Sequence, residues 1–416
     1  MHIPSALRHR RYRLLWMGMM VSMAGSQMQL AAIHWHIRDL TGEPNPLALG
    51  GIGLARILPV IIFSLVGGVV ADSFNRRRVL FITQSTMALV ALALAWYTFR
   101  GHITIWQIYA LTAIQAIAIS FDLPSRSAII PNLVPAHDLP SAFSLNSIAF
   151  NTGAILGPLL SGFVIAGWGM GFTYLINAFS FLAVILALIL IGQVPQQIQS
   201  RSDAGVGLES VKQGLRFILS QPIIFSTMLL DFFATFFSSA NSMMPIIARD
   251  ILKVGETGYG LLSAAQSIGA VLAAVVVSQI KNIRRQGLVF LSAVVVFGLT
   301  TIGFGLSRDF VLAIQLLVLM GSADAVSTII RNTIRQLQTP DFLRGRMTSI
   351  NQIFFQGGPQ LGEVEAGIVA QLFGVPFSII SGGIGCVVAV LIIIRRWPQI
   401  LRYNGDEPVL AGAAAD

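Results

Sequence analysis

Residues 67–79 read GGVVADSFNRRRV and interrupt a long run of apolar residues. Two glycines lead to Asp72, then a short turn and three consecutive arginines, after which the apolar run resumes. So short a charged break is typical of a loop that joins two membrane-spanning helices on one side of a bilayer.

The composition also indicates a membrane protein. Of the 416 residues, 55% are hydrophobic and 11% are charged, whereas soluble domains carry about 25% charged residues. The net charge of +9 does not indicate nucleic acid binding, because the basic residues lie between apolar runs and not on one polar face. The single cysteine, Cys386, excludes an intrachain disulfide, and we expect no metal site and no cofactor.

Apolar runs long enough to cross a bilayer recur from end to end, and each crossing needs about 20 residues. We count twelve, which predicts an all-α integral membrane protein; their approximate limits are 14–38, 46–71, 78–100, 104–126, 141–166, 170–192, 222–248, 257–280, 286–306, 309–334, 346–372 and 375–395. The first run is too long for a signal peptide, so we expect it to remain as a span. Most lysines and arginines lie beside the N-terminus and in alternate loops, which predicts that both termini are cytoplasmic.

The one long internal loop divides the spans into six plus six. We predict an N-terminal six-helix bundle at 1–192, a cytoplasmic linker at 193–221, a C-terminal six-helix bundle at 222–397 and a disordered cytoplasmic tail at 398–416. Within the linker, apolar residues recur at helical spacing, which predicts an amphipathic helix on the membrane surface.

The two halves of the chain are related in sequence. An offset of 205 residues aligns 135–169 with 340–374 without a gap, and the identities include Gly153/Gly358, Gly157/Gly362 and Gly169/Gly374. The pair Arg126/Arg331 has the same offset. Duplicated halves are typical of transporters whose substrate site lies between the repeats, so we predict two pseudo-symmetric bundles.

The pattern Gly68-x-x-x-Asp72-x-x-Asn75-Arg76-Arg77 resembles the signature loop of the major facilitator superfamily. Asn75 replaces the second glycine of that signature, and asparagine also tolerates a left-handed backbone. The resemblance implies the major facilitator fold and a gate latch in which the arginine links the aspartate to an acid of the fourth span. It assigns the latch to Gly68, Asp72, Arg76, Arg77, Asp122 and Arg126. The alternative is a positive-inside anchor, which explains the arginines but not the aspartate.

Two further stretches resemble exporters of this superfamily. GAILGPLLSG at 153–162 is similar to the glycine-proline motif of drug–proton antiporters, carried here by Gly153, Gly157, Pro158 and Gly162. The alternative is an ordinary face of small residues for helix packing. Residues 120–146 and 176–185 resemble the bacterial group of enterobactin (siderophore) exporters and macrolide efflux pumps.

Acids at membrane depth are candidates for proton coupling, because inserting each one costs roughly 2.5–3.5 kcal/mol. Four qualify: Asp231, Asp324, Glu363 and Glu365. The two glutamates lie about 200° apart on a helical wheel, so only one can face a central cavity. The alternative is that one of the acids pairs with Arg331, Arg335 or Arg56 and never titrates.

Polar residues inside the spans are candidates for a substrate cavity, although most buried amides hold helices together. They are Gln27, Arg56, Asn146, Asn151, Asn241, Asn351 and Gln356.

We infer a secondary active transporter that exports a siderophore or drug-like molecule by proton antiport and alternating access, a role related to multidrug resistance. The substrate classes are implied by the resemblance. The alternative is a proton-coupled symporter that imports a small nutrient. We find no enzyme motif. The expected partners are a small-molecule substrate, protons and the lipid bilayer, without nucleic acid, and the expected site of action is the inner membrane of a bacterial cell, as a monomer.

Overall fold

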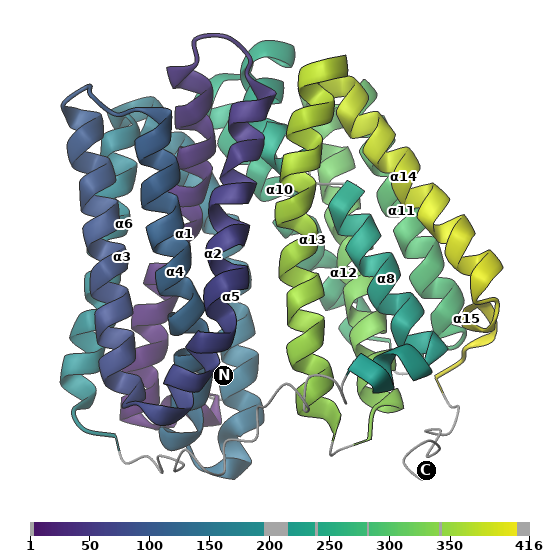
Figure 1. Ribbon diagram of the computed structural model, residues 1–416, viewed down its shortest axis with the longest axis horizontal. Coiled ribbons are helices and arrows are strands. Elements are labelled where there is room, and N and C mark those ends of the chain that lie inside the picture. Colours follow the sequence, from purple (N-terminus) through teal and green to yellow (C-terminus); the bar gives the residue numbers. More distant parts are fainter. Residues whose placement is uncertain (1–3, 195–214, 238–239, 281–282, 341–342, 406–416) are drawn as a thin grey trace. The chain divides into compact units, whose positions relative to one another are not determined.

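The computed structural model describes residues 4–194, 215–237, 240–280, 283–340 and 343–405, and within them every regular element is a helix (Figure 1). The all-α prediction is therefore confirmed for these residues. The chain divides into two compact units. Unit 1 comprises Met1–Ala204 and Met244–Ala264, and unit 2 comprises Gly205–Met243 and Ala265–Asp416.

Unit 1 contains six long helices and several short ones. The long helices are α1 (Arg10–Leu40), α2 (Pro46–Ser73), α3 (Arg76–Phe99), α4 (Ile105–Ile129), α5 (Leu139–Trp168) and α6 (Met170–Ile191). The short ones are η1 (Ser5–Arg8), η2 (Ile130–Asn132), η3 (Ala136–Asp138), α9 (Met244–Ile246) and η5 (Ile247–Ile251), the last a π-helix. The first part of α10 (Gly255–Ser278) completes the unit.

Unit 2 contains the rest of α10 and seven further helices that the structure describes. They are α8 (Pro222–Phe237), η4 (Ala240–Met243), α11 (Gln286–Leu306), α12 (Phe310–Gln338), α13 (Arg344–Phe373), α14 (Val375–Arg396) and α15 (Gln399–Arg402). The predicted division at 193–221 lies largely outside the described residues and stays a prediction; residues 215–220 are helical.

The two units repeat one pattern of helix neighbours. In unit 1, α1 packs on α5 and α6, while α3 packs on α4 and α6. In unit 2, α8 packs on α13 and α14, and α11 on α12 and α14. The helices α8, α11, α12, α13 and α14 therefore have neighbours that correspond to those of α1, α3, α4, α5 and α6, in that order. The relation between the halves that the sequence predicts is thus also seen in the packing of their helices.

Glycines of the repeat have matching backbone roles. Gly169 joins α5 to α6 with φ 88°, and Gly374 joins α13 to α14 with φ 90°. Both angles lie in the region that favours glycine. The identity of these two residues at an offset of 205 therefore reflects one turn that is built twice.

The signature loop uses Asn75 differently from our expectation. Its φ of −64° and ψ of 107° are extended, not left-handed, and its side-chain Oδ1 accepts a hydrogen bond from the backbone N–H of Arg78 at 3.2 Å. Asn75 is thus the N-cap of α3, a position that asparagine favours. This cap ends the loop and starts the helix within one residue.

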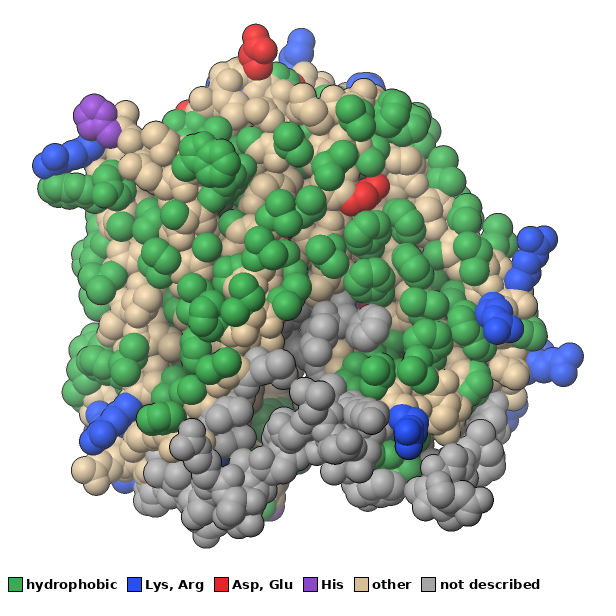
Figure 2. All heavy atoms as spheres, in the orientation of Figure 1, with side chains coloured by type: hydrophobic (Ala, Val, Ile, Leu, Met, Phe, Trp, Pro, Cys, Tyr) green, Lys and Arg blue, Asp and Glu red, His purple; other side chains and the backbone are tan. Residues whose placement is uncertain are grey.

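Nine helices in the described part of the chain are long and apolar enough to cross a membrane. Figure 2 shows hydrophobic side chains over most of the visible face, with lysines and arginines mainly toward its margins. Exposed apolar surface of this extent in a soluble protein would mark an interaction site, and here it suits contact with hydrocarbon.

The span predicted at 222–248 is described in two parts, on either side of residues 238–239. α8 covers Pro222–Phe237, and from Ala240 the chain continues through the 3-10 helix η4, α9 and the π-helix η5. Hydropathy alone does not reveal the 3-10 and π geometry of the second part. The count of twelve spans stays a prediction.

Close helix packing in unit 2 yields a test. A Cβ at Gly269 in α10 would clash with the backbone carbonyl of Val318 in α12, whereas one at Gly167 in α5 would meet nothing within 4 Å. Gly269→Val should therefore lower stability by about 1–3 kcal/mol through overpacking. Thermal unfolding of the purified protein in detergent measures this, with Gly167→Ala as the control. Equal unfolding temperatures for Gly269→Val and the wild type would contradict the described α10–α12 contact.

Candidate functional site

A group of four charged side chains lies inside unit 2, and we call it the α8–α12 charge cluster. It consists of Asp231 on α8 and Asp324, Arg331 and Arg335 on α12. The Arg331 Nη1 lies 2.7 Å from Asp231 Oδ1, and the Arg335 Nη2 lies 3.8 Å from Asp231 Oδ2. The side chains of this ion pair are at most 4% exposed. The contact therefore joins two helices through charges that water barely reaches.

Neutral groups also accept hydrogen bonds from the two arginines. Arg331 donates to the Ser327 hydroxyl at 3.4 Å, and Arg335 donates through Nε to the backbone carbonyl of Arg331 at 3.2 Å. Arg335 also donates to the side-chain oxygen of Asn351 on α13. The cluster thus reaches three helices, α8, α12 and α13.

Asp324 differs from Asp231 in its surroundings. It is half-buried and interacts electrostatically with Arg331 and Asp231. Within the described part of the chain, however, it makes no hydrogen bond and no ion pair closer than 4 Å. The predicted alternative of a fixed arginine partner therefore describes Asp231 and not Asp324.

The repeat places a second buried ion pair in unit 1. Arg126 donates through Nη2 to Asp122 Oδ2 at 2.5 Å, both residues being on α4. Asp122 also accepts from Thr83 Oγ1 at 3.0 Å and from Gln84 Nε2 at 2.7 Å, both on α3. Arg331 occupies the place of Arg126 in the other half, but Ser327 stands where Asp122 would be. The arginine is shared, while its acid comes from a different helix in each unit.

Two arginines of the signature loop, Arg76 and Arg77, donate hydrogen bonds to backbone carbonyls. Arg76 donates to the carbonyls of Ala71 and Ala128 and to the Asn132 side chain, and Arg77 donates to the Leu188 carbonyl. The described partners of Asp122 are Arg126, Thr83 and Gln84, so the link from Arg76 to Asp122 that the resemblance implied stays a prediction. The Asp72 side chain lies outside what the structure describes.

Of the two glycines that open the loop, the tightly packed one is Gly67. A Cβ there would clash with the Ser120 carbonyl of α4, whereas a Cβ at Gly68 would meet nothing within 4 Å. Gly67 was not among the predicted latch residues, because sequence pattern alone does not show which glycine faces the neighbouring helix.

The glycine-proline stretch of α5 packs closely on two neighbours. A Cβ at Gly153 or Gly157 would press on α1, at the backbone of Ala24 and, for Gly157, at the side chain of Gln27. A Cβ at Gly162 would meet Gly260 of α10. Pro158 lies inside the helix, and its carbonyl borders Gly260. The stripe of small residues therefore serves helix packing, which leaves the antiporter role a prediction.

The predicted glutamates lie in different environments. Glu363 is buried, whereas Glu365 is half-buried on the face that carries the exposed Leu361 and Ile368. Neither joins the α8–α12 charge cluster, since the described partners of its arginines are Asp231, Ser327, Asn351 and the Arg331 carbonyl.

The remaining cavity candidates are scattered. Gln27, Arg56 and Asn146 are half-buried, and Asn151 is exposed and bonds to the Ser147 carbonyl of its own helix. The side chains of Asn241 and Gln356 lie outside the described residues. Among the predicted amides whose side chains the structure describes, Asn351 is the one that contacts the charge cluster.

Sequence reasoning missed a reciprocal pair of ion pairs in unit 1. Arg38 at the end of α1 binds Asp250 of η5 with two hydrogen bonds of 2.7 and 2.5 Å, and Arg249 binds Asp39 at 2.7 Å. The dipeptide Arg-Asp occurs at 38–39 and again at 249–250. Each arginine thus bonds the aspartate of the other copy, as a two-fold relation requires. The dipeptide also occurs at 308–309, so its recurrence alone could not have revealed this pair.

Aromatic contacts reinforce the same junction. The Tyr259 hydroxyl of α10 donates to the Ala31 carbonyl of α1 at 2.8 Å, and the Tyr259 ring lies 5.1 Å from that of Trp35. Both rings are buried. Together with the reciprocal ion pairs, these contacts attach the segment Met244–Ala264 to α1.

Comparison with known proteins gives consistent matches over almost the whole chain. Residues 4–402 match the family described as transmembrane secretion effector. The enterobactin exporter EntS of Citrobacter koseri is 26% identical over 84% of this chain and 83% of its own length. The enterobactin exporter EntS of Salmonella typhi is 24% identical over 96% of this chain and 95% of its own.

Solved structures show the same fold at low sequence identity. A POT family transporter in complex with 5-aminolevulinic acid has a TM-score of 0.74 at 15% identity, covering 94% of this chain and 96% of its own. A bacterial homologue of the iron transporter ferroportin, in an inward-facing state, has a TM-score of 0.69 at 14% identity, covering 93% and 98%.

The ion pair Arg38–Asp250 should contribute more to stability than the ion pair Arg249–Asp39. The Arg38 side chain is 4% exposed, whereas those of Arg249 and Asp39 are about 40% exposed. Asp250→Asn should cost about 2–5 kcal/mol because it leaves a buried cation without its partner, and Asp39→Asn about 0.2–1 kcal/mol. Chemical unfolding monitored by tryptophan fluorescence measures both. An equal loss from the two substitutions would contradict this assignment.

Proposed function

Since the chain belongs to the transmembrane secretion effector family of the major facilitator superfamily, we propose that it exports a siderophore or a similar amphipathic molecule by proton antiport. Membership makes it a multi-pass membrane transporter and not an enzyme. Two relatives aligned over at least 83% of their length are enterobactin exporters, which supports export and a siderophore-like cargo.

The α8–α12 charge cluster is the observation that carries the coupling part of the proposal. Charged groups in a membrane-spanning bundle are costly and serve transport or proton relay by default. Here two acids and two arginines balance one another, so protonating one acid leaves the cluster with an uncompensated positive charge. A proton therefore changes the forces between α8 and α12 without any other ligand.

Asp324 is our first choice for the proton carrier. Asp231 is held by Arg331 and Arg335, and losing its charge would leave two buried cations to repel each other. Asp324 is half-buried and lacks such a fixed partner, so a proton can enter and leave at lower cost. Glu363 and Glu365 stay candidates for a second proton site, since both lie on a helix that contacts the cluster through Asn351.

Alternating access requires contacts that form in one state and break in the other. We propose that the reciprocal ion pairs of Arg38–Asp250 and Asp39–Arg249 are such contacts, because they are small, polar and partly reached by water. A lock of this kind resists opening until the segment Met244–Ala264 moves.

The proposed topology follows from the distribution of basic residues. Arg76, Arg77 and Arg78 lie with the N-terminal arginines on the side that we assign to the cytoplasm. The reciprocal ion pairs, at the opposite end of α1 from Arg10, then lie outside. We propose a monomer in the bacterial inner membrane, with bundles at 1–192 and 222–397, a linker at 193–221 and a tail at 398–416.

Transport in proteoliposomes tests the proposal. Enterobactin supplied on the cytoplasmic face should be exported in exchange for protons that move down their gradient in the opposite direction. A pH-sensitive dye follows the proton movement. Asp324→Asn should slow coupled flux at least about tenfold, equivalent to about 1.4 kcal/mol, while binding of enterobactin persists. Glu43→Gln, in an exposed loop, is the matched control.

Three results would count against this assignment. Enterobactin flux that does not change with the proton gradient would exclude antiport. Movement of enterobactin and protons in the same direction would favour the symporter. Undiminished flux in Asp324→Asn, with loss in Glu363→Gln or Glu365→Gln, would move the proton site to α13.

A further inference from the structure

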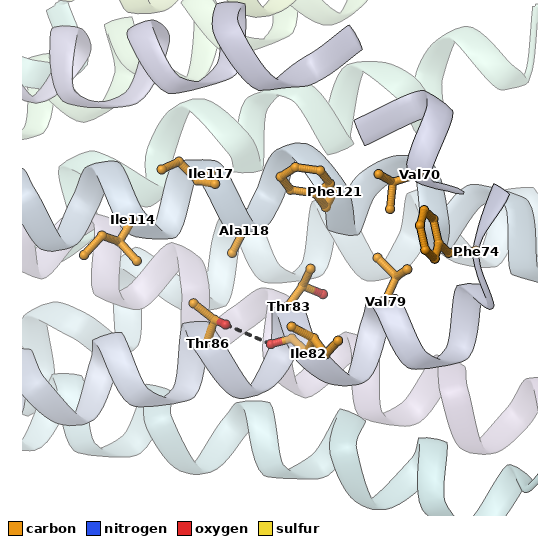
Figure 3. Close-up of a pocket in the computed structure, with 10 residues that line it drawn as sticks. All are labelled: Val70, Phe74, Val79, Ile82, Thr83, Thr86, Ile114, Ile117, Ala118 and Phe121. Carbon is orange, nitrogen blue, oxygen red and sulfur yellow. Dashed lines mark hydrogen bonds between the residues drawn. The ribbon is translucent and has the colours of Figure 1, made fainter. Parts of the chain in front are cut away.

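An apolar groove lies on the surface of unit 1 between α2, α3 and α4. Figure 3 shows its lining, which includes Phe74 just after α2, Ile82 of α3 and Phe121 of α4. Its volume is about 420 Å³, within the roughly 300–1,000 Å³ typical of small-molecule sites. The groove is far from the α8–α12 charge cluster in sequence, and the proposed transport mechanism does not use it.

The residues that line the groove favour an apolar ligand. Its two hydroxyl groups are already bonded, since Thr83 donates to Asp122 and to the Leu80 carbonyl, and Thr86 donates to the Ile82 carbonyl at 2.9 Å. The other lining side chains are hydrocarbon. Phe74 and Ile82 are 60% and 64% exposed, so the groove is open to whatever surrounds the helices, which for a multi-pass membrane protein is lipid.

Arg78 is the charged residue of α3 that precedes the lining residues Val79 and Ile82 in sequence. Arg78 lies one residue before Val79 and four before Ile82, so that it is on the Ile82 side of α3. Arg76 donates hydrogen bonds to the Ala128 carbonyl and to the Asn132 side chain, and Arg77 donates to the Leu188 carbonyl. The Arg78 side chain is exposed and makes no hydrogen bond or ion pair with any described residue, so its charge is available to a ligand.

We propose that the groove binds an anionic phospholipid, with an acyl chain along Phe74, Ile82 and Phe121 and the phosphate at Arg78. Basic side chains beside gaps between membrane-spanning helices are known to select anionic headgroups. The apolar lining suits the acyl chain of the lipid, and the positive charge of Arg78 suits a negatively charged headgroup. A neutral lipid would satisfy only the first of these features.

Such a lipid would act on the signature loop. Thr83 forms the wall of the groove and also donates to Asp122, and Arg78 provides the backbone N–H that Asn75 caps. Binding would therefore stabilise the start of α3 and the α3–α4 contact. This effect is independent of the cargo, so its failure would not affect the proposed transport function.

Thermal unfolding of the purified full-length protein in detergent tests the proposal. The probes are palmitoyl-oleoyl phosphatidylglycerol and palmitoyl-oleoyl phosphatidylcholine, which share their chains and differ in charge. Phosphatidylglycerol should raise the unfolding temperature of the wild type by about 3 °C more than phosphatidylcholine does. Glycerol 3-phosphate alone, which supplies the charge without a chain, should give no rise.

Variants separate the headgroup from the tail. Arg78→Gln should abolish the difference between the two lipids, Arg78→Lys should keep most of it, and Thr86→Trp, which fills the groove, should reduce both effects. Arg402→Gln, at another exposed arginine, is the control and should behave as the wild type. Equal responses of the wild type to both lipids, a preference that survives Arg78→Gln, or a response to glycerol 3-phosphate alone would each overturn the proposal.

Discussion

A charge inside a bundle of apolar helices needs a counter-charge, and this constraint organises the protein. Removing a carboxylate or a guanidinium from water costs several kcal/mol per ion, which only close pairing and added hydrogen bonds offset. Close pairing is met by Asp122 with Arg126, Asp231 with Arg331 and Arg38 with Asp250, all at 2.7 Å or less, and Asp122 also accepts hydrogen bonds from Thr83 and Gln84. Helix packing through small residues then brings the paired charges close enough to bond.

The two units apply the constraint in different ways. In unit 1 the acid and the arginine lie on one helix, and Thr83 and Gln84 fix the carboxylate further, so the pair holds its own helix and its neighbour in place. In unit 2 the acid is on α8 and the arginines are on α12, so the ion pair forms only while these two helices stay close together. A duplicated arginine has thus become a fixed support in one half and, in our proposal, a movable contact in the other.

The sequence predicted the helices well wherever an apolar run is bounded by charge or glycine. The run expected at 170–192 is α6 (Met170–Ile191), and the one expected at 375–395 is α14 (Val375–Arg396). The 3-10 helix η4 and the π-helix η5 escaped prediction, because they change backbone geometry without changing hydropathy. For Asp231 the sequence offered Arg331, Arg335 and Arg56 as partners, and only the packing of helices selects among them.

The central claim is that the α8–α12 charge cluster is stable because its charges balance, and the most direct measurement is a double-mutant cycle on Asp231 and Arg331. The wild type has two acids and two arginines, each single neutralisation unbalances them, and the double neutralisation restores balance with one of each. Asp231→Asn and Arg331→Gln should each lower the free energy of unfolding by about 3–5 kcal/mol, and the double variant should recover most of that loss. Losses that simply add in the double variant would contradict the account.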